Sequence, residues 1–245
     1  MDKTILITGS SSGIGKATAL RFAKEGYNII INYLDNKQGA DEVVLEIQKL
    51  GSKAIAIQAD ITEEKEAERL VNESLKEFQT IDILVNNVGG YIDGDEWNGS
   101  SNIWKDTFNK NIISTLNVSK FLIPLFLKDK KGIIINMSSR YCVDGQIDAI
   151  AYAASKAAIV NITQSYTKLL APFGRANSVS PGPVKTGYWL RAEQSEIDEN
   201  LKQIPLHSFV LPEEVADMIY YLCSDSGRMI TGQNLFIDGG YNLIK

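Results

Sequence analysis

The sequence predicts an α/β fold: one doubly wound parallel sheet with helices on both faces. Short β-branched runs alternate with longer helical stretches along the 245 residues. The short runs are apolar throughout instead of alternating with polar residues, which is typical of strands covered on both faces. Helical crossovers between such strands make neighbouring strands parallel. No linker, repeat or low-complexity tract interrupts the pattern, so we expect a single domain over residues 1–245.

The first half of the chain supplies four strands. Thr4–Thr8 is a buried strand, and the next three strands are Asn28–Tyr33, Ala54–Gln58 and Ile81–Asn86. The helices between them are Ile14–Glu25, Gln38–Leu50 and Glu63–Phe78. Gly26 and Gly51 end the first two helices, because glycine is favoured just past a helix end. Thr62 is expected to cap the third.

The second half continues the alternation to the end of the sheet. Its predicted strands are Gly132–Met137, Asn177–Ser180 and Asn234–Asp238, and its predicted helices are Ile103–Lys128, Ala149–Leu170 and Pro212–Ser224. The stretch from about 183 to 205 is rich in Gly, Pro and charge and follows a strand. Ligands bind at the carboxyl edge of such sheets. This stretch therefore reads as a mobile substrate lid.

Composition excludes several classes of function. The net charge of -5 argues against a nucleic-acid or anionic-membrane partner, which would require a basic patch. The only histidine is His207, and Cys142 and Cys223 are far apart, so no metal site is expected. The first residues lack signal-peptide architecture, and the apolar run Phe121–Leu127 is too short to span a bilayer. We expect a cytoplasmic protein with reduced thiols.

A glycine-rich turn follows the first strand. It reads Thr8-Gly9-Ser10-Ser11-Ser12-Gly13-Ile14-Gly15, and the first helix begins within it. Glycines allow the tight turn and the close approach of a pyrophosphate, and the helix N-terminus offers free N–H groups and partial positive charge. The spacing alone is weak evidence, but its position at the first strand–helix junction predicts dinucleotide binding. The expected contacts are Gly9, Ser11, Ser12, Gly13, Ile14 and Gly15.

The TGxxxGIG string resembles the short-chain dehydrogenase/reductase family, and further motifs follow in the family's order. The resemblance implies a Rossmann-type fold and a nicotinamide cofactor. Asp60-Ile61 resembles the adenine-contacting position, and Asn86-Asn87-Val88-Gly89 resembles the NNAG motif with valine in place of alanine. Pro181-Gly182 resembles the PG motif before the lid, and Thr186 the threonine that contacts the carboxamide. Cofactor contacts are accordingly expected at Asp60, Ile61, Asn87, Val88, Gly89, Pro181, Gly182, Val184 and Thr186.

The family's active site is a Tyr-x-x-x-Lys pair with a serine and an asparagine. The chain contains three such pairs: Tyr33/Lys37, Tyr152/Lys156 and Tyr241/Lys245. Only Tyr152/Lys156 lies on a long helix after the fifth strand, with both side chains on one face. Ser139 lies thirteen positions upstream, as the family requires, with Ser138 as the neighbouring alternative. Asn111 matches the family's asparagine.

These residue types suit carbonyl reduction. Hydride addition to carbon leaves charge on oxygen, so a proton donor is needed there. Efficient donation near pH 7 requires a tyrosine pKa of about 7 instead of about 10. An ammonium about 4 Å away, at an effective dielectric near 20, supplies about the 4 kcal/mol required. We therefore expect Lys156 to lower the pKa of Tyr152. The resemblance implies that Tyr152 and Lys156 also contact the cofactor, that Ser139 orients the carbonyl, and that Asn111 holds a water.

The end of the second strand bears on the choice of cofactor. An acidic side chain there selects NAD by bonding the ribose 2′-OH. The aligned residue is Tyr33, preceded by Asn32, and Asp35 comes only in the loop. Without that carboxylate, Ser12, Asn32 and Lys37 are candidates to bind a 2′-phosphate. We therefore expect NADP, with NAD as the alternative.

Three functions remain open at this stage. The first is a carbonyl reductase resembling the 3-oxoacyl-carrier-protein reductase subgroup, and the second is a sugar or polyol dehydrogenase on the same site. The third, a nucleotide-sensing regulator without turnover, is disfavoured because a binder does not need Tyr152. The aromatic residues of the flanking loops suggest an apolar or ring-stacking substrate: Trp97, Trp104, Tyr188 and Trp189. The family commonly packs its alanine-rich helix against a second copy, which implies a homotetramer.

Overall fold

Seven parallel strands form the centre of the molecule. The structure is a computed structural model that describes residues 3–243. The strands lie side by side in the order β3-β2-β1-β4-β5-β6-β7, and every neighbouring pair is parallel. Their bounds are β1 (Thr4–Ile7), β2 (Asn28–Tyr33), β3 (Ala54–Gln58), β4 (Ile83–Asn86), β5 (Ile133–Met137), β6 (Arg175–Pro181) and β7 (Asn234–Ile237). The expected doubly wound parallel sheet is confirmed.

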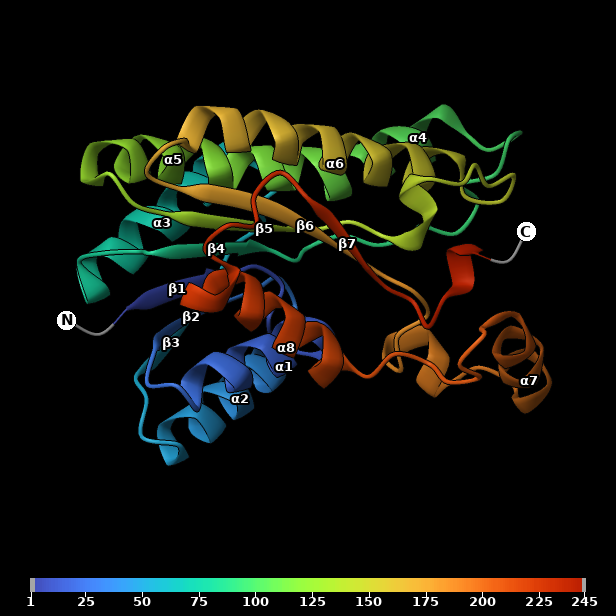
Figure 1. The fold of residues 1–245 in the computed structure, drawn as a ribbon, viewed down its shortest axis with the longest axis horizontal. Helices are drawn as coiled ribbons and strands as arrows, with labels where there is room; N and C mark the ends of the chain where they lie inside the picture. Colours follow the sequence, from blue (N-terminus) through green and yellow to red (C-terminus); the bar gives the residue numbers. More distant parts are fainter. Residues whose placement is uncertain (1–2, 244–245) are drawn as a thin grey trace.

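Helices cover both faces of this sheet (Figure 1). On one face lie α1 (Gly13–Ala23), α2 (Lys37–Lys49) and α8 (Pro212–Cys223). On the other lie α3 (Glu64–Phe78), α4 (Ser101–Phe108), α5 (Ser114–Asp129) and α6 (Ile150–Leu170). A further helix, α7 (Gln194–Gln203), stands apart from these layers, beyond the carboxyl ends of the strands (Figure 1).

The two layers of helices explain why the strands are apolar throughout. Ile5 and Ile7 of β1 pack with the α1, α2 and α8 side, while Leu6 packs with the α3 and α5 side. All three are 0% exposed. Each buried side chain of this kind stabilises the fold by about 1.5–3 kcal/mol relative to leaving it exposed.

The order of the strands determines where a ligand can bind. The chain builds outward from β1 to β3, then returns to place β4 on the other side of β1. Crossovers therefore leave β1 and β4 toward opposite faces, which opens a crevice outside their carboxyl ends. The glycine turn follows β1 and the Asn87–Gly89 segment follows β4, so both predicted cofactor segments lie at this crevice.

The long helix expected over 103–128 is confirmed, and it contains an irregularity that the sequence did not predict. The chain forms α4, then a π-helical turn over Asn109–Ile113, then α5. The turn contains Asn111, whose side-chain amide donates to the carbonyl oxygens of Thr107 and Gly90 at 2.9 and 3.0 Å. π-Helical turns inside helices are rare and frequently mark functional sites. This turn brings the Asn111 side chain against the backbone of Gly90, a contact that a regular helical period does not reveal.

The region after β6 is more ordered than its composition indicated. The expected lid over about 183–205 contains a 3-10 turn at Gly187–Leu190 and the whole of α7. Its mobility remains a prediction. β6 also begins two residues earlier than expected, because Arg175 pairs in register with Ile133 and Ala176 with Ile134.

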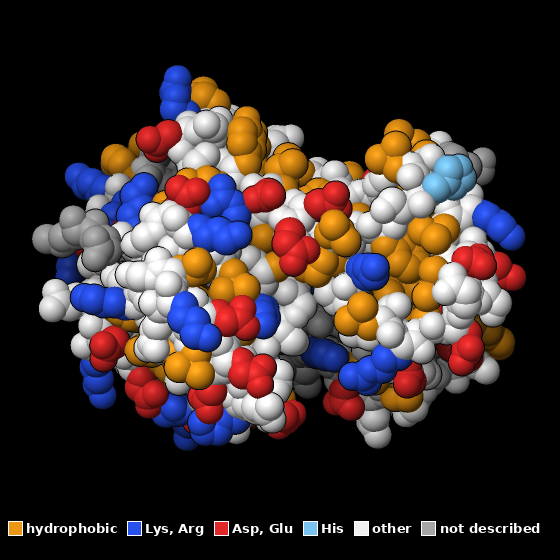
Figure 2. Space-filling view, turned by 90° about the horizontal axis from the view of Figure 1, so that it is seen from below, with side chains coloured by type: hydrophobic (Ala, Val, Ile, Leu, Met, Phe, Trp, Pro, Cys, Tyr) orange, Lys and Arg blue, Asp and Glu red, His pale blue; other side chains and the backbone are white. Residues whose placement is uncertain are grey.

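The described surface bears on possible partners. Positive and negative side chains are interspersed over the face formed by α1, α2 and α8, with no broad basic patch on that face (Figure 2). Within residues 3–243, no helix is long and apolar enough to cross a membrane.

Candidate active site

The turn after β1 has the geometry of an anion cradle. Gly9 and Gly13 adopt left-handed backbone angles, with φ of 59° and 56°. At Gly15, a Cβ would lie 2.6 Å from the carbonyl oxygen of Gly9, so only glycine fits. Helix α1 begins at Gly13, and the Ser12 side chain makes no capping hydrogen bond. The first N–H groups of α1 therefore remain available to an anion, and the residues present fit a dinucleotide pyrophosphate.

Hydrogen bonds from the end of β4 hold this turn in place. Asn87 Nδ2 donates to the carbonyl oxygens of Thr8 and Gly9 at 2.9 and 3.0 Å. In return, Thr8 Oγ1 accepts from the backbone N–H groups of Asn87 and Val88 at 2.9 and 3.0 Å. The added methyl groups of Val88 lie against the turn, since Val88 Cγ2 is 2.9 Å from where a Cβ on Gly9 would stand. The two strand ends are thus locked as one unit.

The buried side chain of Asn32 also supports this turn through a hydrogen bond. Its Oδ1 accepts from the N–H of Gly9 at 3.2 Å, and its Nδ2 donates to the carbonyl oxygen of Ala59 at 3.1 Å. Asn32 is 1% exposed and Tyr33 is 7% exposed. We expected Asn32 to help bind a 2′-phosphate, but its amide is buried and already occupied. Asn32 therefore shapes the cradle from within the protein, and Tyr33 belongs to the core.

Three of the four predicted catalytic residues line one cavity of about 370 Å³, and the fourth, Asn111, is buried beside it. Ser139 follows β5, while Tyr152 and Lys156 lie one turn apart on α6. The cavity also has walls from the cradle, the Asn87–Gly90 segment and the lid: Ile14, Asn87, Gly89, Gly90, Pro181, Gly182, Pro183, Val184, Thr186, Tyr188 and Trp189. Neither Tyr33 nor Tyr241 lines it: Tyr33 is in the core, and Lys245, the partner of Tyr241 in the motif, lies outside the described residues.

The two serines after β5 have different environments. Ser138 is 4% exposed, and its hydroxyl donates to the carbonyl oxygen of Lys156 at 2.9 Å. The Ser139 hydroxyl instead accepts from the backbone N–H of Tyr141 at 3.3 Å and acts to lower the pKa of Tyr152. Ser138 therefore fixes α6 against β5, and the geometry favours Ser139 as the serine that faces the reacting group.

Lys156 is a buried lysine held by a single backbone group. Its Nζ donates to the carbonyl oxygen of Met137 at 2.9 Å, and the residue is 3% exposed. Burial, with a smaller contribution from the charge of Lys110, lowers the pKa of Lys156 to about 8. A lysine in this environment holds its proton only weakly near neutral pH, which suits a group that exchanges protons.

The electrostatics of Tyr152 differ from the expectation. We expected Lys156 to lower the pKa of this tyrosine, but burial raises the Tyr152 pKa above its ordinary value. The groups that oppose this are Ser139, through its hydrogen bond, and Arg140, through its charge. The ammonium of Lys156 lies 5.6 Å from the centre of the Tyr152 ring and is turned toward Met137.

Asn111 organises the segment after β4. Its Oδ1 accepts from the N–H of Gly90 at 2.9 Å, and its Nδ2 returns a bond to the Gly90 carbonyl. At Gly89, a Cβ would lie 2.7 Å from both Asn111 Oδ1 and Lys156 Nζ. The asparagine and the lysine therefore converge on Gly89. The water expected between them remains a prediction.

Asp60 and Ile61 lie after β3 at the same edge of the sheet. Asp60 Oδ1 accepts from the backbone N–H and the hydroxyl of Thr62, at 3.0 and 2.6 Å. Ile61 is 3% exposed, and its carbonyl oxygen accepts from Asn117 Nδ2 at 3.1 Å. These bonds fix the loop over which an adenine would lie.

Sequence reasoning missed Asp95, which supports the catalytic helix. This carboxylate is 0% exposed, and its two oxygens accept from the backbone N–H groups of Ala151 and Tyr152 at 2.9 and 2.7 Å. A carboxylate at a helix N-terminus is favoured by the helix dipole and by charge-assisted bonds. Asp95 is 56 residues from Ala151, so no local capping pattern could reveal the contact.

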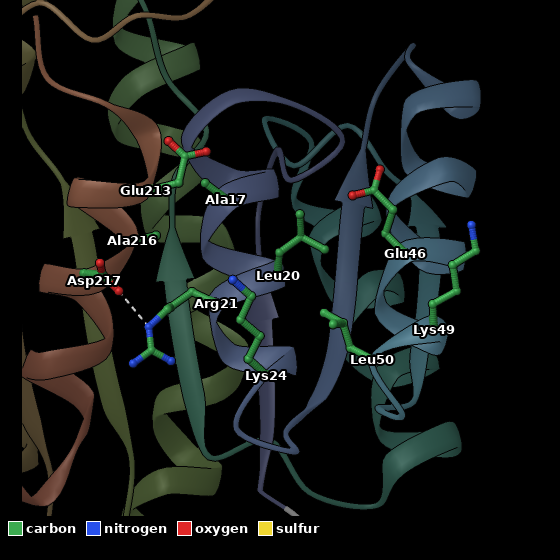
Figure 3. A pocket seen from close by; sticks show the side chains of 10 residues that line it. All are labelled: Ala17, Leu20, Arg21, Lys24, Glu46, Lys49, Leu50, Glu213, Ala216 and Asp217. Atoms are coloured by element: carbon green, nitrogen blue, oxygen red, sulfur yellow. Dashed lines mark hydrogen bonds and ion pairs between the residues drawn. The ribbon is translucent and has the colours of Figure 1, made fainter.

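A second hollow, of about 440 Å³, lies between α1, α2 and α8 (Figure 3). Leu20, Leu50 and Ala216 are among its apolar residues, and charges of both signs line it. Arg21 and Asp217 pair across one side at 2.7 Å (Figure 3). None of the predicted catalytic residues contributes to this hollow. Among the described residues, no cluster of His, Cys, Asp and Glu is arranged to hold a metal ion.

Comparison with known proteins decides the family. A family model described as enoyl-(acyl carrier protein) reductase matches residues 9–242. A 3-oxoacyl-(acyl-carrier-protein) reductase of Staphylococcus epidermidis is 33% identical over 241 residues, covering 98% of this chain and 99% of the relative.

The chain is a short-chain dehydrogenase/reductase.

Two solved structures of this family are similar over almost the whole chain. An actinorhodin polyketide ketoreductase with NADPH matches with a TM-score of 0.91 and 27% identity, covering 98% of this chain and 97% of the other. An NAD+-bound xylitol dehydrogenase matches with a TM-score of 0.91 and 27% identity, covering 97% and 98%. This short-chain dehydrogenase/reductase is therefore an oxidoreductase that depends on NAD(P).

Replacing Asp95 tests the support of the catalytic helix. We predict that Asp95→Ala lowers stability by about 1–2 kcal/mol, as expected for a lost cap, and lowers kcat at least about tenfold because Tyr152 is displaced. Chemical denaturation and steady-state NAD(P)H turnover measure the two effects.

The matched control is Glu214→Ala, which removes the carboxylate that accepts from the N–H of Leu211 at 2.8 Å at the start of α8. That variant should lose stability without a comparable loss of kcat. Equal losses of kcat in both variants would show that Asp95 acts through general stability alone.

Proposed function

We propose that the protein reduces the ketone of a 3-oxoacyl thioester to a 3-hydroxyacyl thioester, with Tyr152 as the proton donor. The observation that carries this is the convergence of Ser139, Tyr152 and Lys156 on a cavity that also borders the cradle of α1. The full-length relative named as a 3-oxoacyl-(acyl-carrier-protein) reductase supports the substrate class.

Each polar residue of the cavity has a distinct task in this reaction. A bound nicotinamide supplies or accepts the hydride. The Ser139 hydroxyl, which lines the cavity together with Tyr152, holds the carbonyl oxygen and stabilises the charge that develops on it. Tyr152 donates its proton to that oxygen, so the ketone gains one hydride and one proton. Lys156, with its pKa lowered to about 8, holds the ribose and returns a proton to the tyrosine.

Asn111 and the cradle position these groups. Because Asn111 fixes both polar atoms of the Gly90 backbone, the segment between cradle and catalytic helix has one conformation. Asn111, within the π-helical turn, would then bind a water that bridges it to Lys156. Asn87 and Gly89 line the cavity and, with Val88 between them, would hold the cofactor on that side. Thr186, at the far wall, would bond the carboxamide.

The outer wall of the cavity supports an apolar substrate. Tyr188 and Trp189 both line it, with ring centres 5.2 Å apart, and Trp189 also packs on Phe209 at 4.7 Å. An aromatic wall suits an acyl chain better than a polyol, which needs many hydrogen-bond partners. A sugar or polyol dehydrogenase on the same site is the second candidate, favoured by the similarity to a xylitol dehydrogenase.

We also propose a preference for NADP(H) over NAD(H). β2 ends in the buried Tyr33 and has no carboxylate there to repel a 2′-phosphate. The start of α2 is close to the cradle, since a Cβ on Gly39 would lie 2.7 Å from the carbonyl oxygen of Ser11. Lys37 begins this helix, and its ion pair with Asp41 at 2.6 Å is exposed. Exposed pairs contribute little, so Lys37 can turn to a phosphate beside Ser12.

Tyr152→Phe tests the proposed chemistry. We predict a loss of at least about 100-fold in kcat with acetoacetyl-CoA, because the ring remains and only the proton donor is removed. The test panel contains acetoacetyl-CoA, crotonyl-CoA, acetoin, glucose and xylitol, each assayed with NADPH or NADP+ as its oxidation state requires. Wild-type turnover of acetoacetyl-CoA in the variant, or a clear preference of the native protein for xylitol or glucose, would overturn the proposal.

Lys37→Ala tests the choice of cofactor. We predict that KM for NADPH rises about fivefold, which corresponds to the free energy of an exposed ion pair, while KM for NADH changes little. Lys49→Ala, at the other end of α2, is the control and should change neither value. A native protein with higher kcat/KM for NADH than for NADPH would contradict the proposed preference.

The assembly is proposed to be a cytoplasmic homotetramer. Ala154 and Ala157 of α6 are exposed small residues that would allow a second copy to approach closely. We predict that light scattering gives the mass of four chains, and that Ala154→Glu reduces it by disrupting this face. A monomeric mass for the native protein would contradict the assignment.

A further inference from the structure

Arg140 occupies an unusual position beside the catalytic serine. It follows Ser139 directly, at the start of the 3-10 turn Arg140–Cys142. Its guanidinium lies between two aromatic rings, with Cζ 4.1 Å from the centre of Tyr141 and 3.8 Å from the centre of Tyr241. A planar guanidinium can stack on two rings at once, which an ammonium cannot do as well. The two rings thus hold the charge of Arg140 in one place.

On one side of Arg140, the Tyr141 ring contacts the proposed proton donor, Tyr152. The ring of Tyr141 meets the ring of Tyr152 edge to face, with centres 6.0 Å apart and an interplanar angle of 83°. This arrangement is favourable for aromatic pairs and restricts the orientation of both rings. Arg140 therefore contacts a ring that itself packs on the catalytic tyrosine.

The other side of the stack leads to the C-terminal turn and the lid. Tyr241 donates a hydrogen bond to the side chain of Gln203, the last residue of α7. Asn242 Nδ2 donates to the carbonyl oxygen of Arg140 at 3.4 Å. A Cβ on Gly239 would lie 2.7 Å from Ile204, so the C-terminal turn and the end of the lid are in close contact. Arg140 is the residue at which these segments meet the catalytic loop.

The charge of Arg140 acts on the hydroxyl of Tyr152. Burial raises the pKa of Tyr152, and Arg140 is the cation that opposes this rise. Arg140 likewise opposes the rise that burial causes in the pKa of Tyr141. The hydroxyl of Tyr152 also faces Ser139 and Tyr141. The hydroxyl of Tyr141 also faces Asp148 and Tyr241.

We propose that Arg140 is a positioning residue for Tyr152: stacked between Tyr141 and Tyr241, it keeps a positive charge beside the proton donor and ties the catalytic loop to the end of the lid. This inference rests on the proposed role of Tyr152 and extends it. Lys156 Nζ donates to Met137 in this structure, and Arg140 adds a second positive charge on the loop side of Tyr152.

The test compares pH profiles of arginine variants. In Arg140→Met, the rise of kcat/KM with pH for oxidation of 3-hydroxybutyryl-CoA should move upward by about 0.5–1 pH unit, because the phenolate loses a stabilising charge. The same variant should lower kcat for acetoacetyl-CoA reduction about tenfold, with KM for NADPH unchanged. Compared with Arg140→Met, Arg140→Lys should restore most of the pH profile, because the positive charge returns. It should restore less of kcat, because an ammonium does not form the planar stack.

The control is Arg21→Met. Arg21 stacks on Tyr220 with Cζ 3.9 Å from the ring centre, on α1 and away from the cavity. The Arg21→Met variant should leave both the pH profile and kcat unchanged. An unshifted profile in Arg140→Met, or the same loss in Arg21→Met, would overturn the proposal.

Two further variants separate the stack from the contact with the lid. Tyr241→Phe keeps a ring against Arg140 and removes the bond to Gln203, whereas Tyr241→Leu removes the ring as well. We expect the shifted pH profile only in Tyr241→Leu; an equal shift in both would refute the role of stacking. If Tyr152→Phe retains full activity, the proposed function itself fails. If that variant is inactive and Arg140→Met behaves as the native protein, only the role of Arg140 fails.

Discussion

The hydrogen bonds between the ends of β1 and β4 are the constraint on which the site depends. Asn87 holds the carbonyl oxygens of Thr8 and Gly9, while Thr8 holds the backbone of Asn87 and Val88. These groups would otherwise be unsatisfied backbone donors and acceptors at the floor of a crevice. Locked together, the two strand ends present the N-terminus of α1 on one side and Gly89 on the other. Cofactor binding and catalysis both need this fixed separation.

Three kinds of contact also hold the catalytic helix α6 in place beside the crevice. The Asp95 carboxylate holds the first turn of α6, Ser138 binds the carbonyl of Lys156, and Lys156 binds the carbonyl of Met137. The helix is therefore fixed at its start and one turn later, so Tyr152 has little freedom. Rigid placement is what general acid catalysis requires of a tyrosine whose burial disfavours its charged form.

The sequence allowed the sheet to be predicted, and it indicated which candidate site residues the fold brings together, because both depend on patterns along the chain. Apolar runs show which strands are buried on both faces, and the order of the glycine turn, Asn87–Gly89, Ser139 and Tyr152 shows which strand ends meet. The features that escaped prediction are contacts between distant segments. The π-helical turn at Asn111 follows from bonds to Gly90, the cap of α6 comes from Asp95, and Asn32 is buried by Ala59. The electrostatics of Tyr152 escaped for the same reason, since Arg140 is held by Tyr241, about 100 residues away.

The central claim is that the cradle of α1 and the Ser139–Tyr152 pair act on one substrate in one cavity. A crystal structure of the Tyr152→Phe protein with NADPH and acetoacetyl-CoA tests this most directly. We predict the pyrophosphate at the N–H groups of Gly13 to Gly15, the nicotinamide in the cavity, and the ketone oxygen within hydrogen-bonding distance of Ser139 Oγ. A ketone oxygen turned away from Ser139 and from ring position 152, or a cofactor bound elsewhere, would contradict it.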